Sequence, residues 1–577
     1  MKNEKCFCSL SVRAVATGVC MLLASCGMVK ENGTAPQIGK SVALFDHFSY
    51  EGHDSFYEEN PLSGGDSFYT PILPGWYSDP SICTNGEGDY FLVTSTFTYF
   101  PGVPIFHSRD LVNWKQVGHV LNRPSQLVNM EKQHVSGGIF APAISYNPHN
   151  KTYYMITTNV GAGNFYVKTQ DPFGDWSDPI MVPEVGGIDP SIFFDEDGKA
   201  YVVNNDDAPD FKPEYDGHRT IRVQEFDWKN DKMVGPRKIL VNKGVHPEEK
   251  PIWIEGPHMY KINGKYFLMD AEGGTSINHS EVIFRSDSPW GPFQAWKNNP
   301  ILTQRHLDSN RPNPVTCAGH ADLIQAAEGD WWAVFLACRP INNRFENLGR
   351  ETFLLPVEWS EDGFPSITQG NEIVPMIQKR EGVKRGENVT FGNFSVMEEF
   401  NDTILGLQWM TLRGPATDLY SLTETPGYLT LKCAPKSTKD FCVPAFVSRR
   451  MQHHEFDAST RMYFNPENAD EKAGLLLFKD ETHQYFMAVS GATDRNIALI
   501  QIGKEEDKVL AKHELSADAV KFDLKVISKG LVYDFVYSLD GGKVWQTLCQ
   551  NVDAGYLSTT VAGGFTGSTI ALYATQK

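Results

Sequence analysis

The chain has 577 residues, too many for one ordinary hydrophobic core, so two or more domains are expected. It carries 52 basic and 71 acidic residues, a formal net charge of −19. This acidic balance and the lack of a dense basic stretch argue against nucleic acid or an anionic membrane surface as the partner. With 49 Gly, 34 Pro and 12% aromatic residues, the composition is typical of a β-rich, turn-rich protein.

The N-terminus predicts export. Lys2, Lys5 and Arg13 precede an apolar run over 14–24, which is about half the length needed to span a bilayer. Leu-Ala-Ser-Cys26 is similar to the bacterial lipoprotein signal, in which Cys26 becomes the lipidated first residue. Residues 1–26 are therefore expected to form this signal and 27–64 a tether and lead-in. The alternative is an ordinary signal peptide with an incidental cysteine.

Five hairpins recur between residues 65 and 375. Their first strands open at 79, 141, 189, 255 and 320, at intervals of 48 to 66 residues. The stretch 187–204, with its turn at Asp197-Gly198, is representative. A period of this length with strands throughout predicts a propeller of four-stranded blades, and five hairpins imply five blades. A β-sandwich with coincidental hairpins is the alternative.

The opening residues differ in chemistry. In a propeller the innermost strands line the axis, so these residues should gather at one mouth of it. A structural cap should be similar in every blade, and divergence at one position is what a shared site requires. Two or three carboxylates in one pocket suit hydrolysis of a glycosidic bond, which needs an acid at the leaving oxygen and a second carboxylate opposite. The five residues are Asp79, Ala141, Asp189, Glu255 and His320.

Each of these residues alone has a structural explanation, because Asp-Pro is common turn chemistry and a single histidine is more often a core residue. The chain has no GxSxG, Walker A, HExxH or Cys/His zinc motif. Six cysteines follow Cys26 without metal-ligand spacing, and no essential disulfide is expected.

A second β-rich region follows a polar linker at 376–393. Alternating strands and a strong hairpin signal at 537–545 predict a β-sandwich over 394–577. We expect this sandwich to wall the pocket, although it could also bind sugar itself.

These motifs resemble the family 43 glycoside hydrolases. The likeness covers residues 70–360, in the family's order, and residues 395–577 look like the concanavalin-like sandwich (jelly roll) that follows the propeller in β-xylosidase-like members. The resemblance therefore implies an all-β protein with a five-bladed β-propeller and a C-terminal β-sandwich. The motifs that carry it are Ser78-Asp79-Pro-Ser-Ile, Gly138-Ile-Phe-Ala-Pro-Ala, Gly187-Ile-Asp189-Pro-Ser, Ile254-Glu255-Gly-Pro-His, Gly319-His320-Ala-Asp, Ala271-Glu-Gly-Gly-Thr275 and Leu348-Gly-Arg-Glu-Thr-Phe-Leu354.

The resemblance also assigns roles. Asp79 would be the general base and Glu255 the general acid, with Asp189 orienting the acid and raising its pKa. The family inverts the anomeric centre, which implies roughly 6.5–9.5 Å between Asp79 and Glu255. Arg350 matches the arginine that contacts the sugar, and Arg339 is a weaker candidate.

Further members of the site follow from the same resemblance. His320 matches a histidine near the propeller axis that is associated with calcium in many relatives, and water is expected between them because histidine is a poor ligand for so hard a cation. No cofactor is required for the chemistry. Aromatic residues that could stack on sugar, or equally belong to the core, are Trp76, Phe97, Tyr99 and Phe140, the last standing where many relatives have tryptophan.

We therefore expect an exported, outer-membrane-anchored lipoprotein, periplasmic or at the cell surface, that is an exo-acting inverting glycosidase. It would release terminal pentoses, leaning to β-1,4-xylosidase action on xylan or xylo-oligosaccharides. Its partners would be oligosaccharides or polysaccharides, and the membrane only through the lipid anchor. The sequence does not indicate an oligomeric state.

Three alternatives stay open. The enzyme could be an α-L-arabinofuranosidase acting on arabinoxylan or arabinan side chains, because the two pentoses present similar hydroxyl geometry. It could be a catalytically silent glycan-binding surface lipoprotein, but all three carboxylate positions are filled. Retaining five-bladed glycosidases that act on fructans carry Asn-Asp-Pro-Asn where this chain has Ser78-Asp79-Pro-Ser81.

Overall fold

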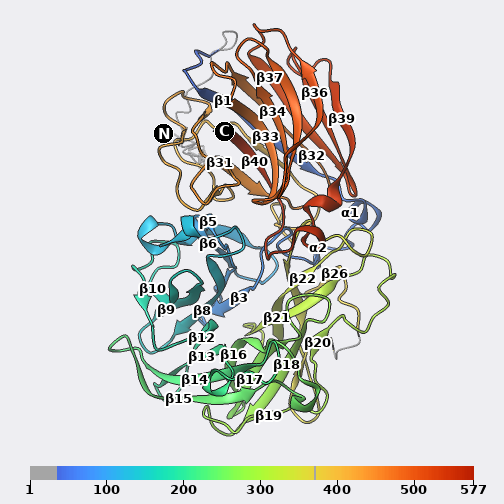
Figure 1. Cartoon of the computed structure of the whole chain (residues 1–577). Coiled ribbons are helices and arrows are strands. Elements are labelled where there is room, and N and C mark those ends of the chain that lie inside the picture. Colours follow the sequence, from blue (N-terminus) through green and yellow to red (C-terminus); the bar gives the residue numbers. More distant parts are fainter. Residues whose placement is uncertain (1–35, 369–371) are drawn as a thin grey trace, which may run out of the picture.

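The computed structural model describes residues 36–368 and 372–577, so the predicted signal and Cys26 lie outside the described residues. Strands form nearly all of the regular structure, arranged as a propeller and a sandwich that lie against each other (Figure 1). No helix in the described part of the chain is long and apolar enough to cross a membrane.

The first four blades are antiparallel sheets whose strands follow one another in sequence. The apolar residues of each blade pack against the neighbouring blades, which is why the strands read as continuous hydrophobic runs. The strands of each blade are given from the axis outward. The first blade has β3 (Ser81–Thr84), β4 (Tyr90–Val93), β6 (Gly102–Ser108) and β7 (Lys115–Leu121), and the second has β8 (Ile139–Asn147), β9 (Thr152–Asn159), β10 (Gly163–Thr169) and β11 (Ile180–Met181).

The third blade has β12 (Ile188–Phe194), β13 (Ala200–Asp207), β14 (Arg219–Asp227) and β15 (Lys232–Asn242). The fourth has β16 (Glu255–Ile262), β17 (Lys265–Glu272), β18 (Ser280–Ser286) and β19 (Gln294–Ala295), and β20 (Leu302–Thr303) also pairs with β18.

The fifth blade closes the ring with a piece of the propeller's own N-terminal segment. Its sheet contains β21 (Thr316–Gln325), β22 (Trp331–Cys338) and β23 (Glu351–Pro356). The next place outward is taken by residues 72–73, since the Ile72 amide donates to the Thr352 carbonyl at 2.9 Å and Leu73 forms a β-bridge with Thr352. The prediction of five blades is confirmed.

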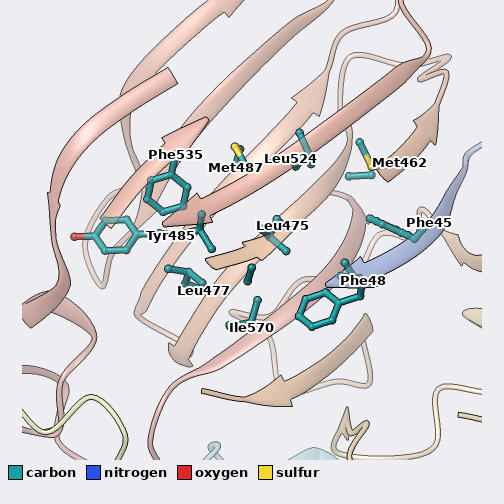
Figure 2. Packing of buried hydrophobic residues seen from close by; sticks show 14 of the residues in the cluster. Phe45, Phe48, Met462, Leu475, Leu477, Tyr485, Met487, Leu524, Phe535 and Ile570 are labelled. Carbon is teal, nitrogen blue, oxygen red and sulfur yellow. The ribbon is translucent and has the colours of Figure 1, made fainter. Parts of the chain in front are cut away.

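The sandwich packs two antiparallel sheets around one apolar core (Figure 2). Side chains from both sheets meet there, among them Phe45, Phe48, Leu475, Tyr485 and Phe535. One sheet has the order β29 (Tyr420–Ser421), β30 (Leu429–Lys432), β1 (Val42–Gly52), β32 (Glu455–Phe464), β37 (Lys521–Lys529), β38 (Val532–Ser538) and β39 (Gln546–Asp553), with β27 (Ser395–Glu398) also on β1. The other has the order β31 (Ala445–Arg450), β40 (Thr569–Gln576), β33 (Glu471–Asp480), β34 (His483–Ser490), β35 (Asn496–Ile502) and β36 (Lys508–Glu514).

Two predicted boundaries are wrong. The tether and lead-in at 27–64 contains β1, an inner strand of the sandwich that pairs with β32 and β30. A bulge between Phe45 and His47 divides β1 into two alternating halves, so that Phe45 and Phe48, three residues apart, are both fully buried in the sandwich core. The linker at 376–393 contains β26 (Ile377–Lys379), which pairs with β2 (Ser67–Tyr69), and buried Phe391, so this segment packs on the propeller.

The two domains share a packed interface. Strand β5 (Tyr99–Phe100) of the propeller pairs with β28 (Thr411–Leu412) of the sandwich region. Aromatic and aliphatic residues of both domains form one buried cluster. Arg450 of the sandwich donates to the Trp76 carbonyl at 2.9 Å, and its guanidinium lies 4.1 Å from the Trp76 ring centroid. Six cysteines in the described residues, from Cys83 onward, are free thiols.

Candidate active site

Backbone bulges at the heads of the inner strands position the site. Asp79, Asp189 and His320 have φ angles of 53°, 52° and 52°, a left-handed conformation that is uncommon outside glycine. The pairing register shifts at this level in the β12–β13 and β21–β22 hairpins. A bulge re-aims the side chain that precedes the regular ladder, and here the three side chains reach one cavity at the mouth of the axis.

Glu255 does not occupy the same backbone position, which corrects the predicted five-fold equivalence. In the fourth blade the left-handed position before the proline is Gly256, with φ 57°. Glu255 lies one residue earlier, where it pairs with Ala271 of the adjacent strand. Because successive side chains of a strand point to opposite faces, this offset brings Glu255 into the cavity from a different direction than Asp79 and Asp189.

The cavity has a volume of about 530 Å³ and contains all three predicted carboxylates. All five blades contribute to it: the inner strands β8, β12, β16 and β21 supply Ala141, Asp189, Glu255 and His320, and Asp79 stands two residues before β3. The C-terminal sandwich closes one side with Thr559, Gly564 and Phe565. The expectation that the sandwich walls the pocket agrees with this arrangement.

Asp79 lies in a polar, cationic environment. Its Oδ1 is 3.2 Å from Arg350 Nη1 and 3.8 Å from His320 Nδ1. Its Oδ2 accepts hydrogen bonds from the hydroxyls of Ser95 at 2.6 Å and Ser78 at 3.1 Å. Burial opposes ionisation, but Arg350, His320 and the two hydroxyls outweigh it, and the pKa of Asp79 falls below its usual value. Asp79 is therefore held as a carboxylate.

Glu255 lies in the opposite kind of environment. In the described residues its carboxyl group accepts no hydrogen bond and pairs with no cation. Burial, followed by the negative charges of Asp189 and Asp79, raises its pKa well above the ordinary value. For Asp189, burial and then Asp79 raise the pKa to about 7, partly offset by the Gly256 amide, which donates to Asp189 Oδ2 at 3.3 Å. Glu255 is thus the protonated member of the group.

Arg350 connects three parts of the cavity wall. It lies just before β23, and its Nη1 also donates to Thr275 Oγ1 at 2.8 Å. Its guanidinium lies 5.2 Å from the Phe565 ring centroid. The preceding Gly349 has φ 71°, and a Cβ atom there would lie 2.6 Å from the Gly567 amide nitrogen. The sandwich backbone at Gly567 is therefore in close contact with the turn that carries Arg350.

The structure places two of the four predicted aromatic wall residues at the cavity. Phe97 and Phe140 line the cavity, with ring centroids 5.6 Å apart. Trp76 and Tyr99 do not line it, because both are fully buried in the interface cluster with the sandwich. Arg339 also lies elsewhere, where it forms a buried ion pair with Glu351 at 2.7 Å. Its role is structural.

His320 lines the cavity and also a much smaller one of about 10 Å³ behind it on the axis. Burial lowers the pKa of His320 to about 4, so the imidazole is neutral at neutral pH and favours the Asp79 carboxylate by its charge only in acid, where Asp79 itself titrates. Within 36–368 and 372–577, the group of three side chains whose potential metal-ligating atoms lie within 4.8 Å of one another is Cys317, Cys338 and Glu346. That group does not include the axial histidine.

Several cavity residues were missed by the sequence interpretation. Phe565 and Thr559 belong to the sandwich, between 304 and 486 residues from the predicted carboxylates, and no local pattern marks them. Trp253 stands only two residues before Glu255 in an unremarkable Pro-Ile-Trp sequence. Thr275 was within a family motif but without a role. All four line the cavity.

A five-bladed propeller with one ionised and one protonated carboxyl group in a single open cavity has the acid–base pair of a glycoside hydrolase. Comparison with known proteins gives the same class. Residues 68–365 match the model of glycosyl hydrolases family 43, and residues 397–577 match that of the beta xylosidase C-terminal concanavalin A-like domain. The chain belongs to glycosyl hydrolase family 43.

Individual relatives cover most of the chain. A xylosidase/arabinosidase of Butyrivibrio fibrisolvens is 37% identical over 88% of this chain and 95% of its own length. A non-reducing end alpha-L-arabinofuranosidase of Bacteroides ovatus is 36% identical over 88% and 91%. The crystal structure of a GH43_12 protein from a capybara gut metagenome superposes with a TM-score of 0.85 at 41% identity, covering 92% of this chain and 99% of that one.

Proposed function

We propose that the protein is an exo-acting, inverting glycosidase that releases terminal pentoses, with Asp79 as general base and Glu255 as general acid. The observation that carries this proposal is the opposite shift of two carboxyl pKa values in one cavity. Arg350, His320 and two hydroxyls favour the ionised form of Asp79, whereas burial and like charge favour the neutral form of Glu255. Such a divergence separates a base from an acid.

The proton path follows from these states. Asp79 takes a proton from a water molecule that attacks the anomeric carbon, while Glu255 gives its proton to the departing glycosidic oxygen. Inversion requires room for that water, and roughly 6.5–9.5 Å between the two carboxyl groups. Asp189 acts on Glu255 through its charge, because an ionised Asp189 helps to keep Glu255 protonated. The pKa of Asp189 is itself about 7, so its carboxyl group is only partly ionised at neutral pH.

The size and walls of the cavity support a small terminal sugar. Phe97, Phe140 and Phe565 surround the entrance to the carboxylates, with ring centroids 5.6 to 6.3 Å apart. Sugar faces stack on aromatic rings, and Arg350 and Thr275 offer polar contacts to hydroxyls. We lean to β-1,4-xylosidase activity because the C-terminal region matches the beta xylosidase domain model. The named relatives favour α-L-arabinofuranosidase activity as the second candidate.

Hydrolysis of p-nitrophenyl β-D-xylopyranoside and p-nitrophenyl α-L-arabinofuranoside ranks the two activities. Faster cleavage of the xyloside supports the first candidate, and faster cleavage of the arabinofuranoside supports the second. No cleavage of either compound would refute the pentosidase proposal, and tight binding without hydrolysis would support the glycan-binding alternative.

The stereochemical proposal has its own test. Proton NMR of the first product, recorded before mutarotation, should show the anomer opposite to that of the substrate. In a Glu255→Ala variant, azide should not rescue activity through a covalent glycosyl-enzyme, because an inverting enzyme forms none. Retention of configuration, or accumulation of such an intermediate, contradicts the inverting assignment.

The axial cavity does not fit the predicted calcium ion. It has a volume of about 10 Å³ and is lined by His258 and His320 together with Asp79 and Asp189. Ca²⁺ takes six to eight oxygen ligands, and a space this small holds about one water molecule. The ion and the water expected between it and His320 therefore have no room there, and no step of hydrolysis is assigned to calcium.

We also propose that the protein is an exported lipoprotein anchored through Cys26. The support is the sequence alone, a short basic segment followed by an apolar run that ends in Leu-Ala-Ser-Cys26. Metabolic labelling with a palmitate analogue in a bacterial host, compared with Cys26→Ala, tests it. Equal labelling of both proteins would contradict the anchor.

A further inference from the structure

A second cavity adjoins the catalytic one. It has a volume of about 610 Å³ and lies between the β13–β14 connection and the segment before β16. Trp253 lines both cavities. Trp253 is 38% exposed and Phe211, which lines the second cavity, is 79% exposed. Two large aromatic side chains thus stand in solvent beside the catalytic mouth.

The wall that carries Trp253 is firmly built. The Trp253 amide donates to the Gly217 carbonyl at 2.9 Å, and the Tyr215 hydroxyl donates to the Pro251 carbonyl at 2.6 Å. Gly217 has φ 84°, and a Cβ atom there would lie 2.9 Å from Ile252 Cβ. These contacts fasten the β13–β14 connection to the chain that leads into Glu255.

The indole is also supported by a cation. The Arg219 guanidinium lies 4.9 Å from the Trp253 ring centroid, within cation–π range. Arg219 is itself held by Asn205, whose Oδ1 accepts from Nη2 at 2.8 Å and from Nε at 3.1 Å. One face of the indole is therefore occupied by protein, which leaves the exposed part of the ring for a ligand.

Phe211 is held outward by its backbone. Asp210 and Phe211 have φ angles of 55° and 57°, a conformation that costs free energy for residues other than glycine. The Phe211 and Lys212 amides are fixed by hydrogen bonds to Ala208 and Pro209. Strain of this kind at an exposed aromatic residue is typical of a binding surface.

The position of this cavity identifies what it would hold. Trp253 precedes Glu255 by two residues, and Glu255 is the proposed donor to the leaving oxygen. The part of the substrate that leaves must lie on the acid's side of the scissile bond. We propose that the second cavity binds the leaving-group portion of a glycan, with sugar rings stacked on Trp253 and Phe211. This inference rests on the proposed function of Glu255.

The charges in the cavity select the class of glycan. Three carboxylates line it, those of Asp207, Glu214 and Asp216. Asp207 pairs with Arg219 and Glu214 with Lys243, which leaves Asp216 as the carboxylate without an ion pair in the described residues. Carboxylates accept hydrogen bonds from neutral sugar hydroxyls but repel another carboxylate. We therefore expect a neutral oligosaccharide, such as a xylo-oligosaccharide, to bind here more tightly than one with a uronic acid branch.

Kinetics on two substrates test the cavity. One substrate is the p-nitrophenyl glycoside that the unmodified protein cleaves faster. The other is an oligosaccharide with the same pentose, which is xylotriose for a xylosidase and arabinofuranosyl-substituted xylotriose for an arabinofuranosidase. We expect Phe211→Ala to lower kcat/KM for the oligosaccharide about three- to tenfold relative to the aryl glycoside, because a stacking contact of ordinary strength is lost. The control, Phe173→Ala, removes a 55% exposed phenylalanine elsewhere in the propeller and should leave kcat/KM unchanged for both substrates. Equal effects of Phe211→Ala on both substrates would overturn the proposal.

Binding to an inactive variant separates this inference from the proposed chemistry. In a Glu255→Gln background, calorimetry should show that xylotriose binds more tightly than xylose, and that adding Phe211→Ala removes most of this difference. Xylotriose with a glucuronosyl branch should bind more weakly than xylotriose. Equal affinities for xylose and xylotriose, or no binding of either, would overturn the second cavity even if the enzyme is active. If neither pentoside is cleaved but the xylotriose difference is present and sensitive to Phe211, the proposed function fails and the cavity stands.

Discussion

Asp79 and Glu255 line the same cavity, but their surroundings differ in almost every respect. Asp79 receives two hydroxyl hydrogen bonds and lies beside a guanidinium, whereas the carboxyl group of Glu255 has no partner in the described chain and faces other negative charges. Both residues are largely buried, so burial alone does not distinguish them. The difference shows that the neighbours decide which carboxyl group is ionised.

Replacing either carboxyl group by an amide should cause the largest loss of activity. We expect Asp79→Asn and Glu255→Gln each to lower kcat on an oligosaccharide by about 10²–10⁴-fold, the usual contribution of a positioned acid or base. Activity on an aryl glycoside with a good leaving group should survive better in Glu255→Gln, because that leaving group needs less protonation. Asp79→Asn should be equally impaired on both substrates.

Initial-rate kinetics on both substrates measure this difference. The control is Glu196→Gln, which alters a solvent-exposed carboxylate in the turn of the third blade and should leave both rates unchanged. If Asp79→Asn rather than Glu255→Gln were spared on the aryl glycoside, the two roles would be reversed.

Arg350 sets the Asp79 side of the comparison. Replacing it by Met removes the strongest influence that favours the Asp79 carboxylate, so the pKa of Asp79 should rise. Activity requires Asp79 to be ionised, and the acidic limb of the pH–rate profile should therefore move to higher pH. We expect kcat/KM to fall by about tenfold or more as well, because a charge-assisted contact to substrate is lost. An unmoved acidic limb in the profile of kcat/KM would contradict this role.

A variant of Asp189 tests what keeps Glu255 protonated. Asp189→Asn removes the like charge that is second only to burial in raising the pKa of Glu255. Because Glu255 must be protonated to act, the basic limb of the pH–rate profile should move to lower pH. It should stay above the range of an ordinary glutamate, since burial remains. A basic limb that stays in place, measured by kcat/KM against pH, would remove Asp189 from this role.

The carboxylate motifs could be predicted because each is local: a hairpin, a proline and an acidic residue within a few positions. The five-fold comparison misplaced Glu255 by one residue, since the glycine at 256 rather than Glu255 adopts the left-handed bulge. Only backbone geometry separates these two positions. The sequence pattern places both near the axis.

Long-range packing was less accessible. Trp76 and Tyr99 stand close to the Asp79 motif, and nothing nearby shows that a sandwich strand some 350 residues away covers them. β1 has an alternating pattern, but its partners β30 and β32 lie at the other end of the chain. Phe565 likewise lines the catalytic cavity through long-range packing of the sandwich on the propeller. Non-local contacts of this kind leave no spacing to read.

The contribution of the sandwich gives the smallest expected effect. Deleting everything after residue 385 is not a clean test, because it would leave β1 without its sheet and expose the apolar interface around Trp76. Phe565→Ala removes instead one side chain that stacks on Phe97 at 6.3 Å and on the Arg350 guanidinium at 5.2 Å. We expect KM to rise about two- to fivefold with little change in kcat, since the ring contacts substrate and transition state alike. Phe441→Ala, an exposed phenylalanine of the sandwich outside the cavity, should leave KM unchanged. A large loss of kcat in Phe565→Ala would mean that the ring positions Arg350 and Asp79, and the acidic limb of its pH–rate profile would then move as in Arg350→Met.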